Sequence, residues 1–263
     1  GCTWINERNT IVNASSGKSV VILGATSGVA RSIARRFGAL GYAVGLAGRD
    51  REELEILAAD VRARCAVACA ILPFDATAFE THADFLDQCA QVLGELPGGV
   101  VLCFGYMADQ ALAQKDFEVA RRTIDTNLTG AISILERFAA AYEARGNGFI
   151  AALTSVAGDR GRKMNYIYGA AKAGLTAYLQ GLRNRLHASG VRVTTIKPGF
   201  MDTPMTYGMS LPGPLIASPE AAAKAMVDKI TRGKDTAYVP FFWRYIMWII
   251  KSIPERQFKK MSV

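Results

Sequence analysis

The chain has 263 residues, of which 50% are hydrophobic and 21% charged, and its formal net charge is +8. This is the composition of a globular protein with a large core; no apolar run reaches the roughly 18 to 20 residues that cross a bilayer, and we find no secretory signal. The five cysteines show no paired spacing and the two histidines lie far apart, so we expect no metal site, no disulfide framework and no nucleic-acid-binding module.

Short β-branched runs alternate with longer helical patterns after an irregular polar segment at 1–18. The predicted strands are 19–23, 43–47, 67–72, 100–104, 149–154, 191–197 and 236–239. The predicted helices are 29–40, 52–64, 79–93, 117–145, 167–188 and 219–230. Continuous apolar strands separated by helices indicate a parallel sheet covered on both faces. We therefore predict one α/β domain, a doubly wound Rossmann fold over 19–240, followed by a basic amphipathic C-terminal helix in 241–263.

The first predicted strand runs into LGATSGVA, a glycine-rich turn with GxxxGxA spacing that ends at Ala30. Glycines here allow a tight turn in which backbone amides approach a pyrophosphate at the positive end of the next helix. Glycines also occur at ordinary strand-to-helix turns, so the motif alone leaves both interpretations open. The residues of this turn expected to contact a dinucleotide are Gly24, Thr26, Ser27, Gly28 and Val29.

The second predicted strand ends in AGRD, where Gly48 takes the place of an acidic ribose-binding residue and Arg49 follows. A guanidinium at this point suits a 2′-phosphate, so the sequence favours NADP over NAD. An ordinary surface charge is the alternative interpretation of Arg49.

The most informative segment is TSVAGDRGRKMNYIYGAAKAG, at the end of the fifth predicted strand. Ser155 ends that strand, Tyr168 comes thirteen residues later and Lys172 four residues after Tyr168. At i and i+4 the tyrosine and the lysine share one helix face. The ammonium is expected to lower the tyrosine pKa from about 10, which makes Tyr168 a usable acid or base near neutrality. Tyr166 lies six residues before Lys172 and off that face, so it is the weaker candidate.

These motifs, with Asn127 in NLTG and the segment KPGFMDT after the sixth strand, occur in the order typical of the short-chain dehydrogenase/reductase family, which the chain resembles over 19–239. The resemblance implies that Tyr168 protonates a carbonyl oxygen while hydride arrives from nicotinamide C4. It also implies that Ser155 hydrogen-bonds that oxygen and that Lys172 binds the ribose and tunes Tyr168. Asn127 would hold a water in the proton relay.

The resemblance implies further cofactor contacts outside the glycine turn. They are Asp75 at the adenine, Gly105 beside the adenosine ribose, Pro198 and Gly199 in KPGFMDT, and Thr203 at the carboxamide. The sequence departs from the family pattern at Ala30, which replaces a third glycine, and at CFGY (103–106), which replaces the usual NNAG. The second change removes polar side chains that brace the strand end, which puts the adenosine contacts there in question.

Two loops are expected to determine which substrate the protein binds. The loop GDRGRK carries Arg160, Arg162 and Lys163, which either bind a phosphate or form a solvated charged surface. The segment 200–217, which is rich in Met, Pro and Leu and contains Met205, lies where the family places its substrate lid. Flexible thioethers there suit a large apolar ligand, and a lid packed only on itself is the alternative.

The C-terminal run 241–253 has only Arg244, Lys251 and Ser252 as polar residues. Thirteen helical residues extend about 20 Å, too short for a hydrocarbon core of roughly 30 Å. An apolar face with two tryptophans and flanking basic residues suits a helix lying in a membrane interface near anionic headgroups. The alternative is a contact within a homodimer or homotetramer, because family members often bury C-terminal segments against neighbouring subunits.

This tail, the IYGAAKAG helix and the CFGYMAD strand end resemble the branch that contains the decaprenylphosphoryl-2-keto-pentose reductases. That resemblance implies an NADPH- or NADH-dependent reductase of a keto-sugar carried on a polyprenyl phosphate for envelope or capsular glycans. It also implies a flavin oxidase partner and a cytoplasmic enzyme held at the inner face of the cell membrane. The alternatives are a soluble reductase of small ketones or acyl chains, and a non-catalytic dinucleotide-sensing scaffold. The presence of Asn127, Ser155, Tyr168 and Lys172 disfavours the scaffold.

Overall fold

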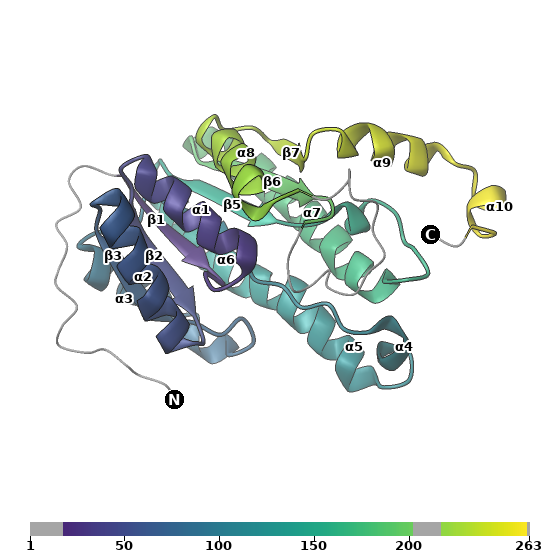
Figure 1. The fold of residues 1–263 in the computed structure, drawn as a ribbon, viewed down its shortest axis with the longest axis horizontal. Coiled ribbons are helices and arrows are strands. Elements are labelled where there is room, and N and C mark those ends of the chain that lie inside the picture. The colour runs from purple at the N-terminus through teal and green to yellow at the C-terminus, as the bar shows by residue number, and fades with distance from the viewer. Residues whose placement is uncertain (1–17, 202–216, 262–263) are drawn as a thin grey trace.

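The structure, a computed structural model, describes residues 18–201 and 217–261. Seven strands form one parallel sheet in the order β3-β2-β1-β4-β5-β6-β7 (Figure 1). The strands are β1 (Ser19–Leu23), β2 (Ala43–Gly48), β3 (Cys69–Pro73), β4 (Gly99–Leu102), β5 (Phe149–Leu153), β6 (Arg192–Pro198) and β7 (Thr236–Val239). The predicted doubly wound α/β fold is confirmed.

The strand order changes direction at β1, which pairs with β2 on one side and with β4 on the other. The chain runs outward from β1 to β3, crosses back to β4, and then runs outward to β7. In open α/β sheets such a switch point opens a crevice at the carboxyl ends of the strands, and ligands bind there. The topology therefore places the expected site just beyond Leu23 and Leu102.

Helices cover both faces of the sheet and bury two clusters of apolar side chains. The helices over the first cluster are α1 (Gly28–Ala39), α2 (Arg51–Cys65) and α8 (Pro219–Thr231). Those over the second are α3 (Phe85–Leu93), α6 (Gly130–Arg145) and α7 (Tyr166–Leu186). Successive strand residues point to opposite faces, so Val20 belongs to the first cluster and Val21 to the second. Burial on both faces explains why the strands are apolar without alternation.

Two predicted helices are interrupted in the structure. The prediction for 79–93 becomes a 3₁₀ turn, η1 (Phe79–Thr81), followed by α3. The prediction for 117–145 becomes α5 (Phe117–Ile124), a π-helical turn, η2 (Asp125–Thr129), and α6. A π turn adds one residue to a helical turn and hardly changes the apolar pattern, so periodicity did not reveal it. The short elements that the sequence did not predict are α4 (Gln110–Ala113) and η3 (Val156–Gly158), and the end of the helix predicted for 167–188 is a 3₁₀ turn, η4 (His187–Ser189).

The C-terminal region forms two helices, α9 (Trp243–Ser252) and α10 (Glu255–Phe258), rather than one. Pro254 separates them: the residue before a proline is driven out of the helical region, and Ile253 is indeed extended, with ψ of 124°. Figure 1 shows both helices at the end of the molecule beyond β7. None of the described helices is long and apolar enough to span a membrane.

Candidate active site

A cavity of about 320 Å³ lies at the carboxyl ends of β1, β4, β5 and β6. The predicted site residues in its wall are Thr26, Ser27, Gly28, Val29, Gly105, Ser155, Arg162, Tyr168, Lys172, Pro198 and Gly199. Apolar side chains, among them Met107, Val156 and Phe200, form much of the remaining wall. Residues from four separate loops therefore meet in one site. Thr203 and Met205 lie outside the described residues.

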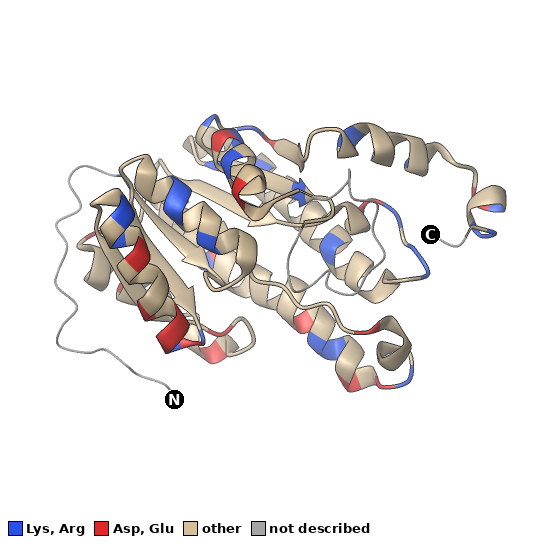
Figure 2. Cartoon of the chain, viewed as in Figure 1, with Lys and Arg blue, Asp and Glu red and all other residues tan. Residues whose placement is uncertain are grey.

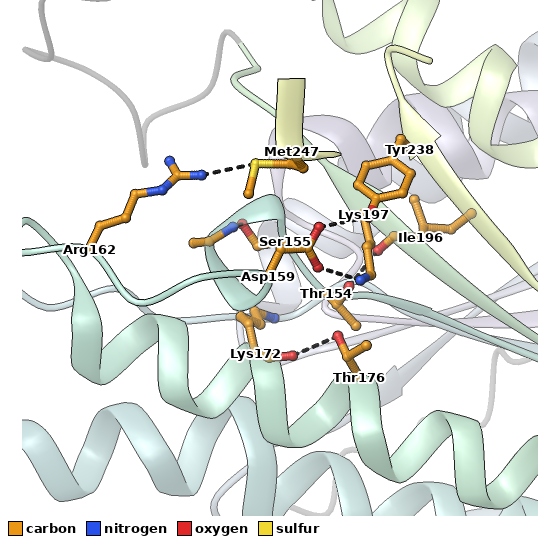
Figure 3. Close-up of polar contacts among 11 residues, drawn as sticks. Thr154, Ser155, Asp159, Arg162, Lys172, Thr176, Ile196, Lys197, Tyr238 and Met247 are labelled. Carbon is orange, nitrogen blue, oxygen red and sulfur yellow. Dashed lines mark hydrogen bonds and ion pairs between the residues drawn. The ribbon is translucent and has the colours of Figure 1, made fainter. Parts of the chain in front are cut away.

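Ser155, Tyr168 and Lys172 reach this cavity from two elements. Ser155 directly follows β5, while Tyr168 and Lys172 lie one turn apart on α7. Both Ser155 and Lys172, which are labelled in Figure 3, line the cavity. The competing tyrosine, Tyr166, is 44% exposed and does not line the cavity, whereas Tyr168 is 8% exposed and does. Tyr168 is therefore the phenol available to a substrate.

The predicted lowering of the Tyr168 pKa is wrong. Burial raises the pKa of Tyr168 to about 12, and a hydrogen bond with Ser155 offsets only part of this rise. The Lys172 ammonium lies 5.8 Å from the centre of the phenol ring and donates to the Leu153 carbonyl at 3.1 Å. Loss of hydration therefore outweighs its attraction for the phenolate. Near neutral pH the phenol is protonated, which is the form that can donate a proton.

Lys172 is 2% exposed, and burial lowers its pKa to about 8. The folded protein holds a buried ammonium below this pH, whereas in the unfolded chain the same group is hydrated. Between pH 8 and pH 10.5 the unfolded chain therefore binds more protons than the folded one, and stability rises with pH. Below pH 8 the buried charge opposes folding by about 3 kcal/mol, at 1.36 kcal/mol per pH unit.

We expect Lys172→Met to be more stable than the wild type at pH 7, because the variant buries no charge. Urea unfolding of both proteins at pH 7 and pH 10 measures the effect. The wild type should gain stability between the two pH values relative to the variant, by up to about 3 kcal/mol. Parallel behaviour of the two proteins would show that Lys172 does not carry this linkage.

Asn127 lies in the π-helical turn η2 and is fully buried. Its Nδ2 donates to the carbonyls of Tyr106, at 2.5 Å, and Thr123, at 2.8 Å, and its Oδ1 accepts from the Tyr106 N–H at 3.3 Å. A Cβ atom on Gly105 would stand only 3.0 Å from that Oδ1. Asn127 therefore holds the loop after β4 in place through the Tyr106 backbone. This loop lacks the polar side chains of the usual NNAG segment, and Asn127 provides polar contacts there instead.

A second cavity, of about 690 Å³, adjoins the first, and Thr26, Ser27, Phe104 and Gly105 line both. The predicted residues Gly24, Arg49 and Asp75 lie in its wall. Gly24 has φ of +79°, and a Cβ there would stand 2.7 Å from the Phe104 backbone, so this turn requires glycine.

The beginning of α1 is open to an anion at the junction of the two cavities. Ser27 is the N-cap residue of α1 but makes no side-chain capping hydrogen bond, so the first N–H groups of the helix keep their donors for a ligand. Two joined cavities with such a donor set between them fit a dinucleotide whose pyrophosphate lies at the helix N-terminus.

Asp75 and several residues that the sequence did not predict also line the second cavity. Burial raises the pKa of Asp75, but hydrogen bonds from Thr77 and the charge of Arg49 lower it by more than that. The pKa of Asp75 therefore lies below its ordinary value, and the carboxylate is ionised at neutral pH. Among the residues that were not predicted as site residues are Tyr106, Glu118, Arg121, Arg122, Asp125 and Thr126. The Arg122 guanidinium stacks over the Tyr106 ring at 4.6 Å. The charged residues on α5 have the spacing of an ordinary amphipathic helix, so their pattern provided no reason to predict them as site residues.

Arg160 and Lys163 do not line the cavity, so of the two interpretations left open for this loop, phosphate binding does not apply to these two residues. Arg160 Nη1 donates to the carbonyls of Ile250, at 2.5 Å, and Ile253, at 2.6 Å, and Nη2 pairs with Glu255 at 3.0 Å. Its guanidinium also lies 3.7 Å from the centre of the Phe258 ring. Arg160 therefore anchors the C-terminal segment to the loop after β5, and Lys163 is exposed to solvent.

The inner face of α9 packs behind the active site. Trp243 and Met247 are at most 2% exposed and form a cluster with Val156, which lines the cavity. A Cβ on Gly199 would stand 1.9 Å from Trp243 Nε1, so the indole lies directly against the loop after β6. The prediction that both tryptophans face a membrane interface is therefore wrong for Trp243. Trp248, on the opposite side of α9, is 70% exposed.

Asp159 fixes the loop after β5, the loop that also carries Arg160, to the sheet. Its carboxylate pairs with Lys197 on β6 and accepts a hydrogen bond from the Tyr238 hydroxyl of β7 at 2.7 Å (Figure 3). The loop that carries Ser155 and Arg162 is thus held from the sheet at Asp159 and from the tail at Arg160.

Comparison with known proteins shows the family of this chain. Residues 18–211 match the family described as short chain dehydrogenase. An uncharacterized oxidoreductase of Mycobacterium tuberculosis is 36% identical over 242 residues, which are 92% of this chain and 96% of that protein. One from Streptomyces coelicolor is 34% identical over 247 residues, 94% and 96% of the two chains. A short-chain dehydrogenase from Sphingobium yanoikuyae, solved in complex with NADPH, superimposes with a TM-score of 0.78 at 25% identity over 91% of this chain and 97% of the other.

Proposed function

This chain belongs to the short-chain dehydrogenase family, and from that premise we propose that it reduces a ketone to a secondary alcohol with NADPH. The observation that carries the proposal is the convergence of Ser155, Tyr168 and Lys172 in one cavity that adjoins a second cavity lined by the glycine turn and Arg49. Bound NADPH supplies the hydride. Tyr168 donates its phenolic proton to the carbonyl oxygen, Ser155 orients that oxygen, and Lys172 contacts the nicotinamide ribose.

The cofactor preference rests on Arg49. Its exposed guanidinium lies in the wall of the second cavity with Asp75, Thr26 and Ser27, where a 2′-phosphate would accept its hydrogen bonds. The similar Sphingobium yanoikuyae protein was solved with NADPH. Following NADPH and NADH absorbance with a panel of free and lipid-linked ketones tests both the reaction and the preference.

We expect Arg49→Ala to weaken NADPH binding by about 1 to 3 kcal/mol, the range for hydrogen bonds to charged groups, and to leave NADH binding nearly unchanged. Fluorescence titration of both cofactors measures the two affinities. The matched control is Arg51→Ala, which removes a charge two residues away on α2 and should not distinguish the cofactors. Equal losses for NADPH and NADH in Arg49→Ala would show that Arg49 does not bind the 2′-phosphate.

For the substrate, we favour a keto-sugar carried on a polyprenyl phosphate, with a flavin oxidase as the partner that supplies the ketone. Two observations support a lipid-linked substrate: the largely apolar wall of the active-site cavity, and the outer face of α9, which consists of Tyr245, Trp248 and Ile249. Each of these three side chains is at least 58% exposed, and their i, i+3, i+4 spacing places them on one side of the helix.

Basic residues outnumber acidic ones on α9 and α10. Arg244 and Lys251 lie on α9, and Arg256, Lys259 and Lys260 lie on or after α10, against the single acidic residue Glu255 (Figure 2). All six are exposed. An exposed apolar strip with basic neighbours suits the surface of an anionic membrane.

We expect the protein to co-sediment with phosphatidylglycerol vesicles, less so at high salt, where headgroup attraction is screened. Trp248→Glu should abolish binding, because a charged group does not replace an indole at the acyl boundary. Phe117→Glu is the matched control, since Phe117 is 76% exposed on α5, away from the tail. If the wild type ignores vesicles and Trp248→Glu dissociates an oligomer on a sizing column, the tail is a subunit contact, and the alternative of a soluble reductase of small ketones or acyl chains is favoured.

A further inference from the structure

Arg162 is a half-buried cation in the wall of the active-site cavity with few partners for its charge. Its Nη2 lies 3.1 Å from Met247 Sδ, a weak acceptor, and its Nε is buried with no hydrogen-bond partner among the described residues (Figure 3). The acidic residue that influences it, Asp159, is already paired with Lys197 and hydrogen-bonded to Tyr238. Burial lowers the pKa of Arg162, the mark of a cation whose lost hydration is not repaid within the protein.

Asn165 presents a second unsatisfied group to the same cavity. It is the N-cap residue of α7, yet its side chain makes no capping hydrogen bond, and its Oδ1 is buried without a partner in the described part of the chain. The Asn165 N–H donates to the Arg162 carbonyl at 3.1 Å, closing a turn that keeps the two residues adjacent. Asn165 is three residues before Tyr168, so the pair borders the proposed reaction centre.

We propose that Arg162 and Asn165 bind an anionic oxygen group, a phosphate or a carboxylate, carried by the ketone substrate. This subsite rests on the proposed reductase function and names the polar end of its substrate. A half-buried guanidinium without a charged partner costs free energy, and an anion that accepts hydrogen bonds from Arg162 removes that cost. The Asn165 Nδ2 can donate to the same anion, whereas the buried Oδ1 is an acceptor and requires a hydroxyl group of the substrate as its donor. The apolar residues Met107, Val156 and Phe200 then contact the rest of the substrate.

The test compares ketones that differ only in the anionic group. Ribulose 5-phosphate and ribulose form one pair, and 4-oxopentanoate and 2-pentanone form the other. Binding to the NADP⁺-loaded protein is measured by calorimetry and turnover by NADPH absorbance. We expect at least one anionic ketone to bind about 10- to 100-fold more tightly than its neutral partner. A difference in the ribulose pair indicates a phosphate site, and a difference in the pentanone pair indicates a carboxylate site.

Arg162→Met should abolish this preference, Arg162→Lys should retain part of it, and Asn165→Ala should reduce it. Lys163→Met is the matched control, because it removes an exposed charge from the same loop. Unchanged NADP⁺ affinity in each variant shows that the fold is intact. Equal wild-type affinity for charged and neutral partners in both pairs, or an anion preference that survives Arg162→Met, would overturn the subsite.

The subsite and the reductase proposal fail separately. If Arg162-dependent anion binding is found but no ketone oxidises NADPH, the subsite stands and the proposed reaction falls. If ketones are reduced but the anionic group makes no difference, the reaction stands and the subsite falls.

Discussion

Tyr168→Phe is expected to lower kcat by about 10²- to 10⁴-fold, the usual contribution of a general acid, while NADPH affinity stays within a few-fold of the wild type. The phenol supplies the proton to the carbonyl oxygen, and the phenyl ring that remains keeps the packing of a side chain that is 8% exposed. Single-turnover oxidation of NADPH, together with cofactor titration, separates loss of chemistry from loss of binding.

Tyr166→Phe is the matched control, because it removes the same hydroxyl two residues away, at the exposed beginning of α7. It should turn over at close to the wild-type rate. If Tyr168→Phe is active and Tyr166→Phe is inactive, Tyr166 is the proton donor and the assignment of Tyr168 is wrong. The pH profile adds a second check, since burial raises the pKa of Tyr168 to about 12. In the free enzyme this phenol should remain protonated across the neutral range.

Trp243→Ala is expected to weaken the attachment of α9 to the domain by about 3 to 5 kcal/mol, the cost of truncating a buried tryptophan. Trp243 is 2% exposed and packs against Gly199 and edge-to-face on Phe200, with 5.1 Å between ring centres. Urea unfolding measures the loss of stability, and limited proteolysis at Arg244 and Lys251 measures release of the tail. Because Phe200 and Gly199 line the active-site cavity, the variant should also bind substrate more weakly.

Trp248→Ala provides the comparison, because Trp248 lies on the same helix but is 70% exposed. Surface truncations of this kind change stability by about 0.5 kcal/mol or less, so this variant should unfold like the wild type. Equal effects of the two substitutions would mean that α9 does not pack on the domain through its inner face.

The sequence by itself determined the fold and the members of the proposed catalytic set. The strands at 19–23 and 236–239 were predicted with the bounds that the structure has, because buried parallel strands are apolar without interruption and end at turns. The pair Tyr168 and Lys172 follows from local helix geometry, since residues four apart must share a face. The glycine turn at Gly24 is likewise local, because a positive φ requires glycine there.

Only the tertiary structure decided which charged and aromatic residues serve the site. In the sequence Arg160 and Arg162 are equivalent basic residues two positions apart, but Arg160 anchors the tail some 90 residues away and Arg162 lines the cavity. Trp243 and Trp248 are likewise the same residue type on one helix, but Trp243 is buried and Trp248 is exposed. The direction of the Tyr168 pKa shift also escaped prediction, because it depends on how completely distant segments exclude water from the phenol. Spacing along a helix fixes which neighbours a side chain has, whereas burial and partners depend on contacts between segments far apart in the chain, which no local pattern encodes.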